Sequence, residues 1–371
     1  MKVVMTGGGT AGHVNPALSI AEIIKKYDPS SEIEFIGTKK GLEYKLVPRK
    51  GYKLHTIRIL GIKRSLHPRN IVAAVLTCTS YIRSRALLAK IKPDIVVGTG
   101  GYVTWPVASA AASLGIPCAL HEANAVPGLA VKMLRNKANV VFVNFKETGK
   151  YLGDSSAEII HTGMPINDLF YNMDREVAKK KLGVDGKYKY TILSFGGSLG
   201  AAHLNEAVVE FMDSYVSKHP EICHIHSAGT RNNEGAFKAY KEKGLEKYEN
   251  CKLVEYIYDM PEQMLAADIV ICRSGASTLA ELAAIGKPSV LVPSPHVTND
   301  QQYKNAKLLA DKDAAVVIRD AELDAKRLEK EISVLLNDPK KLAVMGENAK
   351  NFDVRDGERI IFKKIKELSK N

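Results

Sequence analysis

A run of β-branched residues that leads through a glycine-rich turn into a helical stretch occurs twice in this sequence. The first copy joins residues 3–5 to a turn at 7–12, and the second joins residues 191–195 to a turn at 196–200. The equivalent glycines, Gly7 and Gly196, stand 189 residues apart. A strand, a tight turn and a helix in that order are the repeating unit of parallel α/β sheets. We therefore expect two α/β domains built on one plan.

A second pair of segments supports this duplication. Residues 93–97 and 267–271 are Ile/Val-rich runs, and a glycine-containing turn follows each of them. A chain of 371 residues suits two domains, and the Gly/Pro break at 161–165 predicts the boundary. The predicted fold is α/β, with two Rossmann-like parallel-sheet domains (1–163 and 164–371) that face each other across a cleft. We expect the terminal helix to pack back on the first domain, and ligands to bind at the carboxyl ends of the strands.

The cysteines and the hydropathy pattern narrow the class of protein. Five cysteines are spread along the chain without a C-x-x-C pair, which argues against a disulfide framework or a zinc ribbon and favours a reducing compartment. Glycine and proline interrupt the long uncharged run at 95–120, so we do not expect it to span a membrane. The strand-like run begins at Val3, which leaves no room for a signal peptide before the fold. We expect a soluble protein.

The net charge of +12 comes entirely from the first half of the chain. Residues 1–163 hold 22 Lys and Arg against 10 Asp and Glu, whereas the remainder is balanced. A one-sided basic domain favours a polyanionic partner, either a nucleic acid or an acidic membrane surface. No aromatic residues alternate with the basic ones to stack on bases, which disfavours a nucleic acid.

The membrane interpretation concerns one loop at residues 60–69. It mixes apolar and basic side chains, as suits an anionic bilayer surface: Leu60, Ile62, Lys63, Arg64, Leu66 and Arg69. The apolar residues that follow it at helical spacing are predicted to be core instead: Ile71, Val72, Val75, Leu76, Thr79 and Ile82.

The glycine turns indicate the kind of ligand. Residues 7–12 fit the dinucleotide fingerprint G-x-G-x-x-G, but the expected second strand at 32–36 ends without the acid that would bind a ribose. A dinucleotide-dependent oxidoreductase is therefore disfavoured. Glycines let the backbone approach a phosphate, and the helix that follows offers free N–H groups. Further turns at 98–102, 198–200 and 274–278 favour phosphate-rich ligands on both domains, although tight turns without a ligand share this composition.

Several side chains beside these turns have two interpretations from the residues alone. His13 directly follows the first turn and is either a general base or a histidine that holds the loop. Glu281 lies one helical turn beyond residues 277–278 and is either a ribose ligand or an ordinary helix glutamate. The amides at 299–302 suit sugar hydroxyls, but Asn and Asp also begin helices.

Six motifs, taken together and in order, resemble the MurG family of N-acetylglucosaminyltransferases over residues 3–310. They are Gly8-Gly9-Thr10-x-Gly12-His13, Gly100-Gly101-Tyr102-Val103, His121-Glu122-x-Asn124, Gly196-Gly197-Ser198-x-Gly200-Ala201, Arg273-Ser274-Gly275-Ala276 and Asp300-Gln301-Gln302-Tyr303-x-Asn305-Ala306. The resemblance implies a GT-B fold of glycosyltransferase family 28 and the inverting transfer of GlcNAc from UDP-GlcNAc. The implied acceptor is the muramoyl 4-hydroxyl of undecaprenyl-diphospho-muramoylpentapeptide (lipid I), and the product is lipid II for peptidoglycan. The resemblance also implies a peripheral protein on the cytoplasmic face of the cell membrane, without a nucleic acid partner, a metal or another cofactor.

The family's functional residues carry over to matching positions of this sequence. The lipid-linked acceptor would lie on the first domain and UDP-GlcNAc mainly on the second. His13 would accept the proton from the acceptor, helped by Glu122. The donor would be held by Glu281 at the ribose, by Ser198, Ala276, Ser277 and Thr278 at the diphosphate, by Ile257 at the uracil, by Gln301 and Gln302 at the sugar, and by Thr10, Ala11, Gly12 and Asn124 at further contacts. Ala123 and Asn167 depart from the family pattern, and the second departure leaves a donor contact at 167 in doubt.

Other classes of function predict different features of the sequence. Asp311 and Asp313 have the Asp-x-Asp spacing with which a different transferase class holds a metal, but they stand in a charged stretch and are predicted to be solvated surface. A sugar-nucleotide epimerase or hydrolase on the same fold would not need a basic, apolar surface on its first domain. A non-catalytic sensor would bind UDP-GlcNAc and release no UDP.

Overall fold

The computed structural model describes residues 1–61, 69–231 and 233–370 of the chain. It separates into two compact units, one of residues 1–165 together with 354–371 and one of residues 166–353. The chain passes from the first unit to the second after residue 165, which is two residues beyond the expected boundary at 163. The C-terminal residues, which chain order alone assigned to the second domain, belong to the first unit.

In the first unit, the described residues form a seven-stranded sheet with the strand order β3-β2-β1-β4-β5-β6-β7. Every neighbouring pair is parallel. The strands are β1 (Lys2–Thr6), β2 (Glu32–Thr38), β3 (Lys53–Ile57), β4 (Ile95–Gly98), β5 (Cys118–Glu122), β6 (Val140–Val143) and β7 (Glu158–His161). The connecting helices are α1 (Ala11–Tyr27), α2 (Glu43–Arg49), α3 (Arg69–Ile91), α4 (Thr104–Ser113), α5 (Leu129–Leu134) and the 3-10 helix η1 (Lys146–Tyr151).

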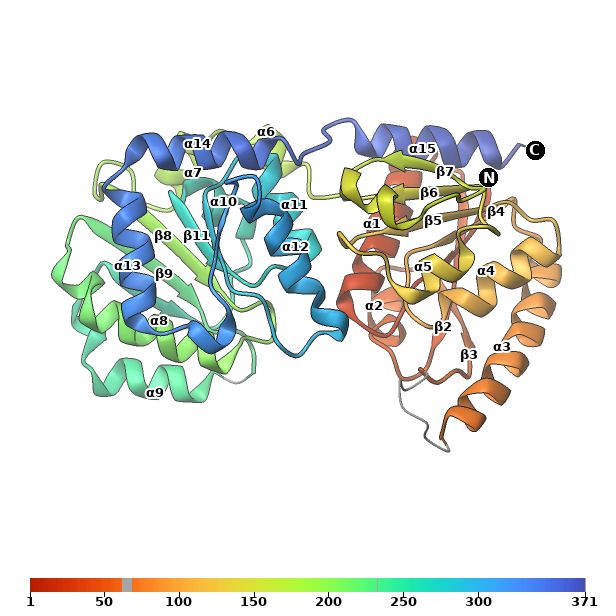
Figure 1. Cartoon of the computed structure of the whole chain (residues 1–371), viewed down its shortest axis with the longest axis horizontal. Helices are drawn as coiled ribbons and strands as arrows, with labels where there is room; N and C mark the ends of the chain where they lie inside the picture. The colour runs from red at the N-terminus through yellow and green to blue at the C-terminus, as the bar shows by residue number, and fades with distance from the viewer. Residues whose placement is uncertain (62–68, 232, 371) are drawn as a thin grey trace. The chain divides into compact units, whose positions relative to one another are not determined.

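The central strand β1 is buried on both faces, as its unbroken apolar run requires. Val3 and Met5 belong to the core cluster that contains the buried residues of α1 and of the C-terminal helix α15 (Gly357–Leu368). Val4 points to the opposite face and belongs to the cluster formed with α3 and α4. The sheet is therefore covered by helices on both sides (Figure 1).

The second unit repeats this plan. Its described residues form a six-stranded parallel sheet with the order β10-β9-β8-β11-β12-β13. The strands are β8 (Tyr190–Phe195), β9 (Ile222–Ser227), β10 (Cys251–Val254), β11 (Ile269–Cys272), β12 (Ser289–Leu291) and β13 (Val316–Val317). The α-helices are α6 (Leu169–Asn172), α7 (Arg175–Lys181), α8 (Ala202–Ser214), α9 (Glu234–Glu242), α10 (Met260–Ala266), α11 (Ala276–Ala284), α12 (Gln301–Ala310), α13 (Ala325–Leu336) and α14 (Pro339–Lys350).

The prediction of two Rossmann-like parallel-sheet domains is confirmed. In each unit the chain builds strands outward from the first one in one direction and then returns to its other side, between β1 and β4 and between β8 and β11. The strand order reverses at these points, and open α/β sheets bind their ligands beside the carboxyl ends of the strands there. The glycine turns singled out in the sequence follow β1, β4, β8 and β11, so all of them lie at such edges.

Helix α15 packs on the first unit beside α1 (Figure 1). Its Ile361 and Ile365 are fully buried in the same cluster as β1. The ring of Phe362 stacks on Tyr27 with centroids 5.0 Å apart. Apolar burial therefore explains why the chain returns to the unit in which it began.

Helix α3 corrects one prediction. Within the stripe predicted to be core, Val72, Val75 and Ile82 keep 52%, 58% and 66% of their accessible surface, and the side chain of Ile71 lies outside the described residues. The face that α3 buries lies beside this stripe and carries Ala73, Ser80, Ser84, Leu88 and Ile91. This buried face packs mainly against α4, and its Leu88 and Ile91 also join the core cluster of β1, so the apolar residues at the offset positions remain outside.

The predicted membrane loop is mostly not described. Ile62, Lys63, Arg64 and Leu66 lie outside the described residues, as does the side chain of Arg69. Among the helices that the structure does describe, none combines the length and the apolar character needed to cross a bilayer.

The packing of α15 on the first unit leads to a prediction about stability. A Cβ atom on Gly357 would overlap the carbonyl oxygen of Thr162, so Gly357→Ala should lower the free energy of unfolding by about 1–3 kcal/mol through overpacking. Gly235 in α9 is the matched control, since a Cβ there meets no atom within 4 Å. Gly235→Ala should leave stability unchanged or raise it by up to about 1 kcal/mol. Urea unfolding followed by circular dichroism measures both, and equal stability of the two variants would contradict the proposed docking contact.

Candidate active site

In the first unit, the turns after β1 and β4 close around His13. A Cβ atom on Gly100 would lie 2.7 Å from His13 Cδ2, and one on Gly101 would overlap the carbonyl oxygen of Gly8. The Thr99 hydroxyl donates a hydrogen bond to the backbone carbonyl of His13 at 2.6 Å. Side chains at these glycines would force the two turns apart, which explains why both turns are glycine-rich.

The environment of the His13 imidazole favours a neutral ring. Nδ1 lies 3.3 Å from the carbonyl oxygen of Gly8, and because a carbonyl can only accept, this contact requires the proton on Nδ1. In that tautomer Nε2 has a free lone pair. Burial lowers the pKa of His13, and the Gly8 carbonyl and the Glu43 charge oppose the decrease. The ring is therefore a base at neutral pH.

The residues that follow the first turn are open to solvent. Thr10, Ala11 and Gly12 are exposed at the start of α1. Thr10 has an extended backbone before the helix, and its hydroxyl oxygen lies 3.2 Å from Nδ1 of His13. The predicted contact residues of this turn and the predicted base are thus brought together at one helix N-terminus.

Glu122 is buried at the end of β5 and is bonded to the loop that follows. Its carboxylate accepts hydrogen bonds from the backbone N–H of Asn124 at 3.0 Å, from the Asn124 side-chain amide at 3.1 Å, and from the Gly128 N–H at 2.8 Å. Burial raises the pKa of Glu122, and these donors lower it. The predicted contact residue Asn124 therefore has its backbone and side chain oriented by Glu122.

One buried residue of this region was missed by sequence reasoning. Glu43, at the start of α2, is fully buried. Its carboxylate accepts from the backbone N–H of Gly9 at 2.9 Å, from the Thr38 N–H at 2.9 Å and from the Thr38 hydroxyl at 2.7 Å. The sequence feature that could have pointed to Glu43 is its position two residues after Gly41, a glycine in the turn that follows β2.

In the second unit, the turn after β8 packs against the turn after β9. Gly197 and Gly200 have positive φ angles of 93° and 78°. A Cβ atom on Gly200 would lie 2.8 Å from the carbonyl oxygen of Arg231. The carbonyl of Ser198 accepts hydrogen bonds from the N–H and the hydroxyl of Thr230, both at 3.0 Å. The Ser198 side chain itself is exposed.

A buried polar network lies beneath this turn. The side-chain oxygen of Asn205 is 3.2 Å from Nε2 of His226, and its amide nitrogen donates to the carbonyl of Ala228 at 2.9 Å. The Ser194 hydroxyl lies between His226 Nδ1 at 2.8 Å and His224 Nε2 at 2.7 Å. Burial lowers the pKa of His226 to about 4, so the network is neutral and links β8, β9 and α8. His224 and His226 alternate along the single strand β9, and this spacing gave no sequence signal for the network.

Helix α11 begins beside this turn, because β11 pairs directly with β8. Gly275 precedes the helix with an extended backbone, and the first helical residues Ala276, Ser277 and Thr278 are half-buried. Glu281 follows on the next turn of the helix, and burial raises its pKa to about 7. The residues predicted to bind the diphosphate, in the turns after β8 and β11, therefore lie at the carboxyl ends of two neighbouring strands.

Gln302 joins the turns after β11 and β12. Its carbonyl accepts from the buried Ser274 hydroxyl at 2.8 Å, and its side-chain oxygen accepts from the Ser294 N–H at 2.8 Å. Gln301 precedes it as the first residue of α12. The two residues before the helix, Asn299 and Asp300, have left-handed φ angles of 61° and 53°. Such angles cost energy in residues other than glycine, so the entry into α12 is tightly determined.

Ile257 lies in the loop after β10. Its side chain is 7% exposed, whereas the neighbouring Tyr256 and Tyr258 are 39% and 91% exposed. The buried side chain leaves the backbone of Ile257 as the part that can meet a ligand. The backbone N–H of Gly229 donates to the Glu255 carbonyl at 2.8 Å, which connects this loop to the turn after β9.

The two carboxylates considered as metal ligands are surface residues, as predicted. Asp311 and Asp313 are exposed, and Lys307 pairs with Asp311 at 2.7 Å. Within the part of the chain that the structure describes, no three His, Cys, Asp or Glu side chains gather in a way that could hold a metal ion.

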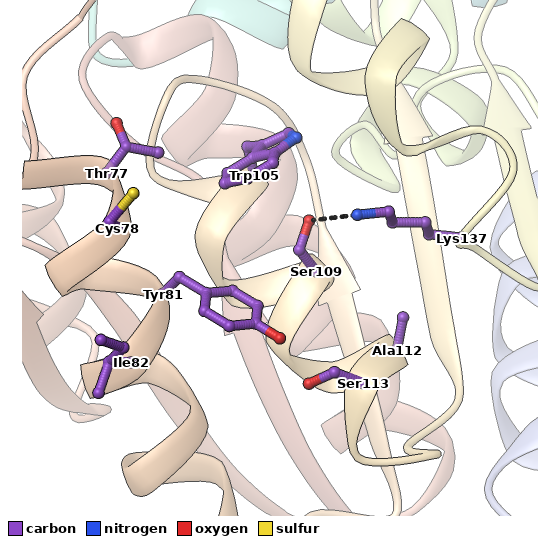
Figure 2. Close-up of a pocket in the computed structure, with 9 residues that line it drawn as sticks. All are labelled: Thr77, Cys78, Tyr81, Ile82, Trp105, Ser109, Ala112, Ser113 and Lys137. Carbon is purple, nitrogen blue, oxygen red and sulfur yellow. Dashed lines mark hydrogen bonds between the residues drawn. The ribbon is translucent and has the colours of Figure 1, made fainter. Parts of the chain in front are cut away.

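The first unit also carries an apolar pocket of about 520 Å³ between α3 and α4 (Figure 2). Lys137 reaches over its rim, with Nζ 5.5 Å from the centroid of the Trp105 ring. Arg85 donates to the Ser113 hydroxyl at 2.7 Å. The pocket is lined by Thr77, Cys78, Tyr81, Ile82, Trp105, Ser109, Ala112, Ser113 and Lys137.

Two family models match most of the chain. Residues 3–143 match the glycosyltransferase family 28 N-terminal domain, and residues 191–360 match the glycosyltransferase family 28 C-terminal domain. The two matches cover the glycine turns of both units.

Similar proteins cover the whole length. A protein of Acetivibrio thermocellus named UDP-N-acetylglucosamine–N-acetylmuramyl-(pentapeptide) pyrophosphoryl-undecaprenol N-acetylglucosamine transferase is 41% identical over 100% of this chain and 99% of its own. The crystal structure of Acinetobacter baumannii MurG is similar with a TM-score of 0.80 and 27% identity over 99% of both chains. A putative UDP-N-acetylglucosamine 2-epimerase from Listeria monocytogenes has a TM-score of 0.67 and 17% identity over 98% of this chain and 95% of its own, and shares the fold alone.

Proposed function

The chain belongs to glycosyltransferase family 28, and we propose that it transfers GlcNAc from UDP-GlcNAc to the muramoyl 4-hydroxyl of lipid I. The product is lipid II, the peptidoglycan precursor. The observation that carries this proposal is the full-length similarity, at 41% identity, to a transferase named for this reaction. The two Rossmann-like units agree with the GT-B architecture of such enzymes.

The first unit would bind the acceptor and provide the base. Nε2 of His13 has the free lone pair needed to take the proton from the attacking hydroxyl, because Nδ1–H is directed to the Gly8 carbonyl. Thr10, Ala11, Gly12 and Asn124 would contribute further contacts to the donor. Glu122 acts in this scheme as a positioning residue for Asn124, since its carboxylate already accepts hydrogen bonds from that residue.

The second unit would bind the donor. The N-terminus of α11 and the turn at Ser198 would hold the diphosphate with backbone N–H groups and the positive end of the helix dipole. These groups also stabilise the charge that develops on the departing UDP during inversion, so no divalent ion is needed for that step. Glu281 would accept hydrogen bonds from the ribose, the backbone of Ile257 would meet the uracil, and Gln301 with Gln302 would meet the sugar.

The surface of α3 and α4 would rest on the cytoplasmic face of the membrane. Exposed Ile82 lines the apolar pocket, Val75 is exposed on the same helix, and Lys137 and Arg85 lie at the pocket rim. The net charge of +12 comes from the same half of the chain. Apolar side chains together with basic ones favour an anionic bilayer, and a surface location brings the enzyme to a lipid-linked acceptor.

The activity is tested by UDP release with and without lipid I. We expect release only with the acceptor, and His13→Ala should lower kcat at least about 100-fold because a general base contributes that much. His219→Ala, at the C-terminal end of a 3-10 helix in the second unit, is the matched control and should keep full activity. Equal UDP release without acceptor would indicate a hydrolase, and a 2-epimerised product would indicate an epimerase.

Donor affinity should depend on pH through Glu281. Burial raises its pKa to about 7, so below pH 7 the carboxyl is mostly protonated and must lose its proton to accept both ribose hydroxyls. The dissociation constant for UDP-GlcNAc should therefore rise about tenfold between pH 8 and pH 6. Isothermal titration calorimetry measures it, and Glu281→Gln should bind weakly with no such dependence. A flat profile in the wild type would exclude the ionised carboxylate from the ribose contact.

Membrane binding should depend on the exposed face of α3. Val75→Glu should weaken sedimentation with anionic phospholipid vesicles about fivefold or more, since one charge near such a surface is worth about 1 kcal/mol. Val344→Glu in α14 is the matched control, because Val344 is 57% exposed and Val75 is 58% exposed. Equal binding of both variants would reject the α3 surface as the contact.

A further inference from the structure

We propose that Glu43 is a positioning residue for the transfer reaction, whose buried carboxylate holds the turn after β1 and thereby orients the imidazole of His13. This inference rests on the proposed role of His13 as the base. Glu43 has no part in the donor or acceptor contacts described above.

The carboxylate of Glu43 occupies a space that three glycines leave open. A Cβ atom on Gly8 would lie 2.5 Å from Oε1 of Glu43, one on Gly37 would lie 2.7 Å from its Cγ, and one on Gly41 would overlap the carboxylate. These glycines come from the turn after β1, from β2 and from the turn after β2. Side chains are therefore absent from three separate segments where this one carboxylate must fit.

The hydrogen bonds of Glu43 explain how it can hold the turn. Oε2 accepts from the N–H of Gly9, while Oε1 accepts from the N–H and the hydroxyl of Thr38. A fully buried carboxylate is costly unless it is well bonded, so these donors keep it in one place. The carboxylate thus ties the turn after β1 to the end of β2.

The turn that Glu43 holds is the one that directs His13. Gly9, which donates to Glu43, directly follows Gly8, whose carbonyl accepts from Nδ1 of His13. In a dinucleotide-binding turn, glycine N–H groups of this kind face a phosphate. Here an internal carboxylate takes the Gly9 N–H instead, so this turn is held from within the protein.

The charge of Glu43 also acts on the imidazole. The titratable groups beside His13 at this turn are the charged Glu43 from α2 and the neutral phenol of Tyr102 from the turn after β4. Glu43 raises the pKa of His13 against the larger effect of burial, and burial together with the Glu43 charge raises the pKa of the Tyr102 phenol. Removing the Glu43 charge therefore lowers the pKa of His13, and the acid limb of the kcat/KM profile should move to lower pH.

The test compares Glu43→Gln with wild type and with His13→Ala. Glutamine has the same shape, but its NH₂ group faces either the Gly9 N–H or the Thr38 N–H, neither of which can accept. We expect kcat to fall about tenfold, less than the loss of about 100-fold expected for removing the base, and the pKa of His13 measured by NMR to fall. In the double variant with His13→Ala, Glu43→Gln should cost less than about twofold further, because residues that act as a unit are not additive.

Two further variants separate positioning from general destabilisation. Glu34→Gln removes a carboxylate from β2 that pairs with His55 instead of the turn, and it should leave the titration of His13 and kcat unchanged. Glu43→Asp keeps the charge but is one methylene too short to reach both partners, so it should largely retain the pKa of His13 and lose turnover even if Glu43→Gln fails to fold.

The outcomes distinguish this inference from the proposed function. An unchanged His13 titration in Glu43→Gln, full turnover in Glu43→Asp, or additive losses in the double variant would each overturn the role of Glu43. Full turnover of His13→Ala would instead remove the base assignment itself, whatever the Glu43 variants show.

Discussion

Close contact between glycine turns at the carboxyl ends of parallel strands is the constraint on which the rest of this structure depends. A side chain on Gly101 would overlap the Gly8 carbonyl in the first unit, and one on Gly200 would lie 2.8 Å from the Arg231 carbonyl in the second. Only glycine lets these backbones approach, and the approach places a helix N-terminus and its free N–H groups at the point where the strand order reverses. The two units share this arrangement, and the proposed function assigns a different task to each.

Burial shifts the pKa of a titratable group at the carboxyl-end edge of each sheet. The shift is downward for the imidazole of the first unit and upward for the carboxyl of the second. Burial lowers the pKa of His13 and thus keeps an imidazole free to accept a proton, whereas it raises the pKa of Glu281 to about 7. Both shifts follow from the cost of a charge in a place with little water. Neighbouring groups partly oppose this effect of burial in the first unit. The Gly8 carbonyl raises the pKa of His13, and the Asn124 and Gly128 donors lower the pKa of Glu122.

The membrane contact proposed for this chain would need an exposed surface that is both apolar and basic, and α3 carries apolar side chains of that kind. The helix buries Ala73, Ser80 and Ser84 and leaves Val75 and Ile82 exposed, and Ile82 lines a pocket that Lys137 also lines. Helical spacing identifies an apolar stripe, but it does not say whether the stripe faces the core or a bilayer. The same ambiguity does not arise for α15, whose Ile361 and Ile365 are fully buried.

Local pattern was enough to predict the two parallel-sheet units and the sites of the turns, because a strand, a glycine turn and a helix are adjacent in the chain. It also led to His13, Ser198 and Glu281, which stand within a few residues of those turns. Contacts between distant segments could not be predicted in this way: the bond from Glu43 to Gly9, the His226–Asn205 pair beneath the second turn, and Gln302 between Ser274 and Ser294. Hydrogen bonds of this kind have no period in the sequence, and they arise only when packing brings separate strands and helices to one edge of a sheet.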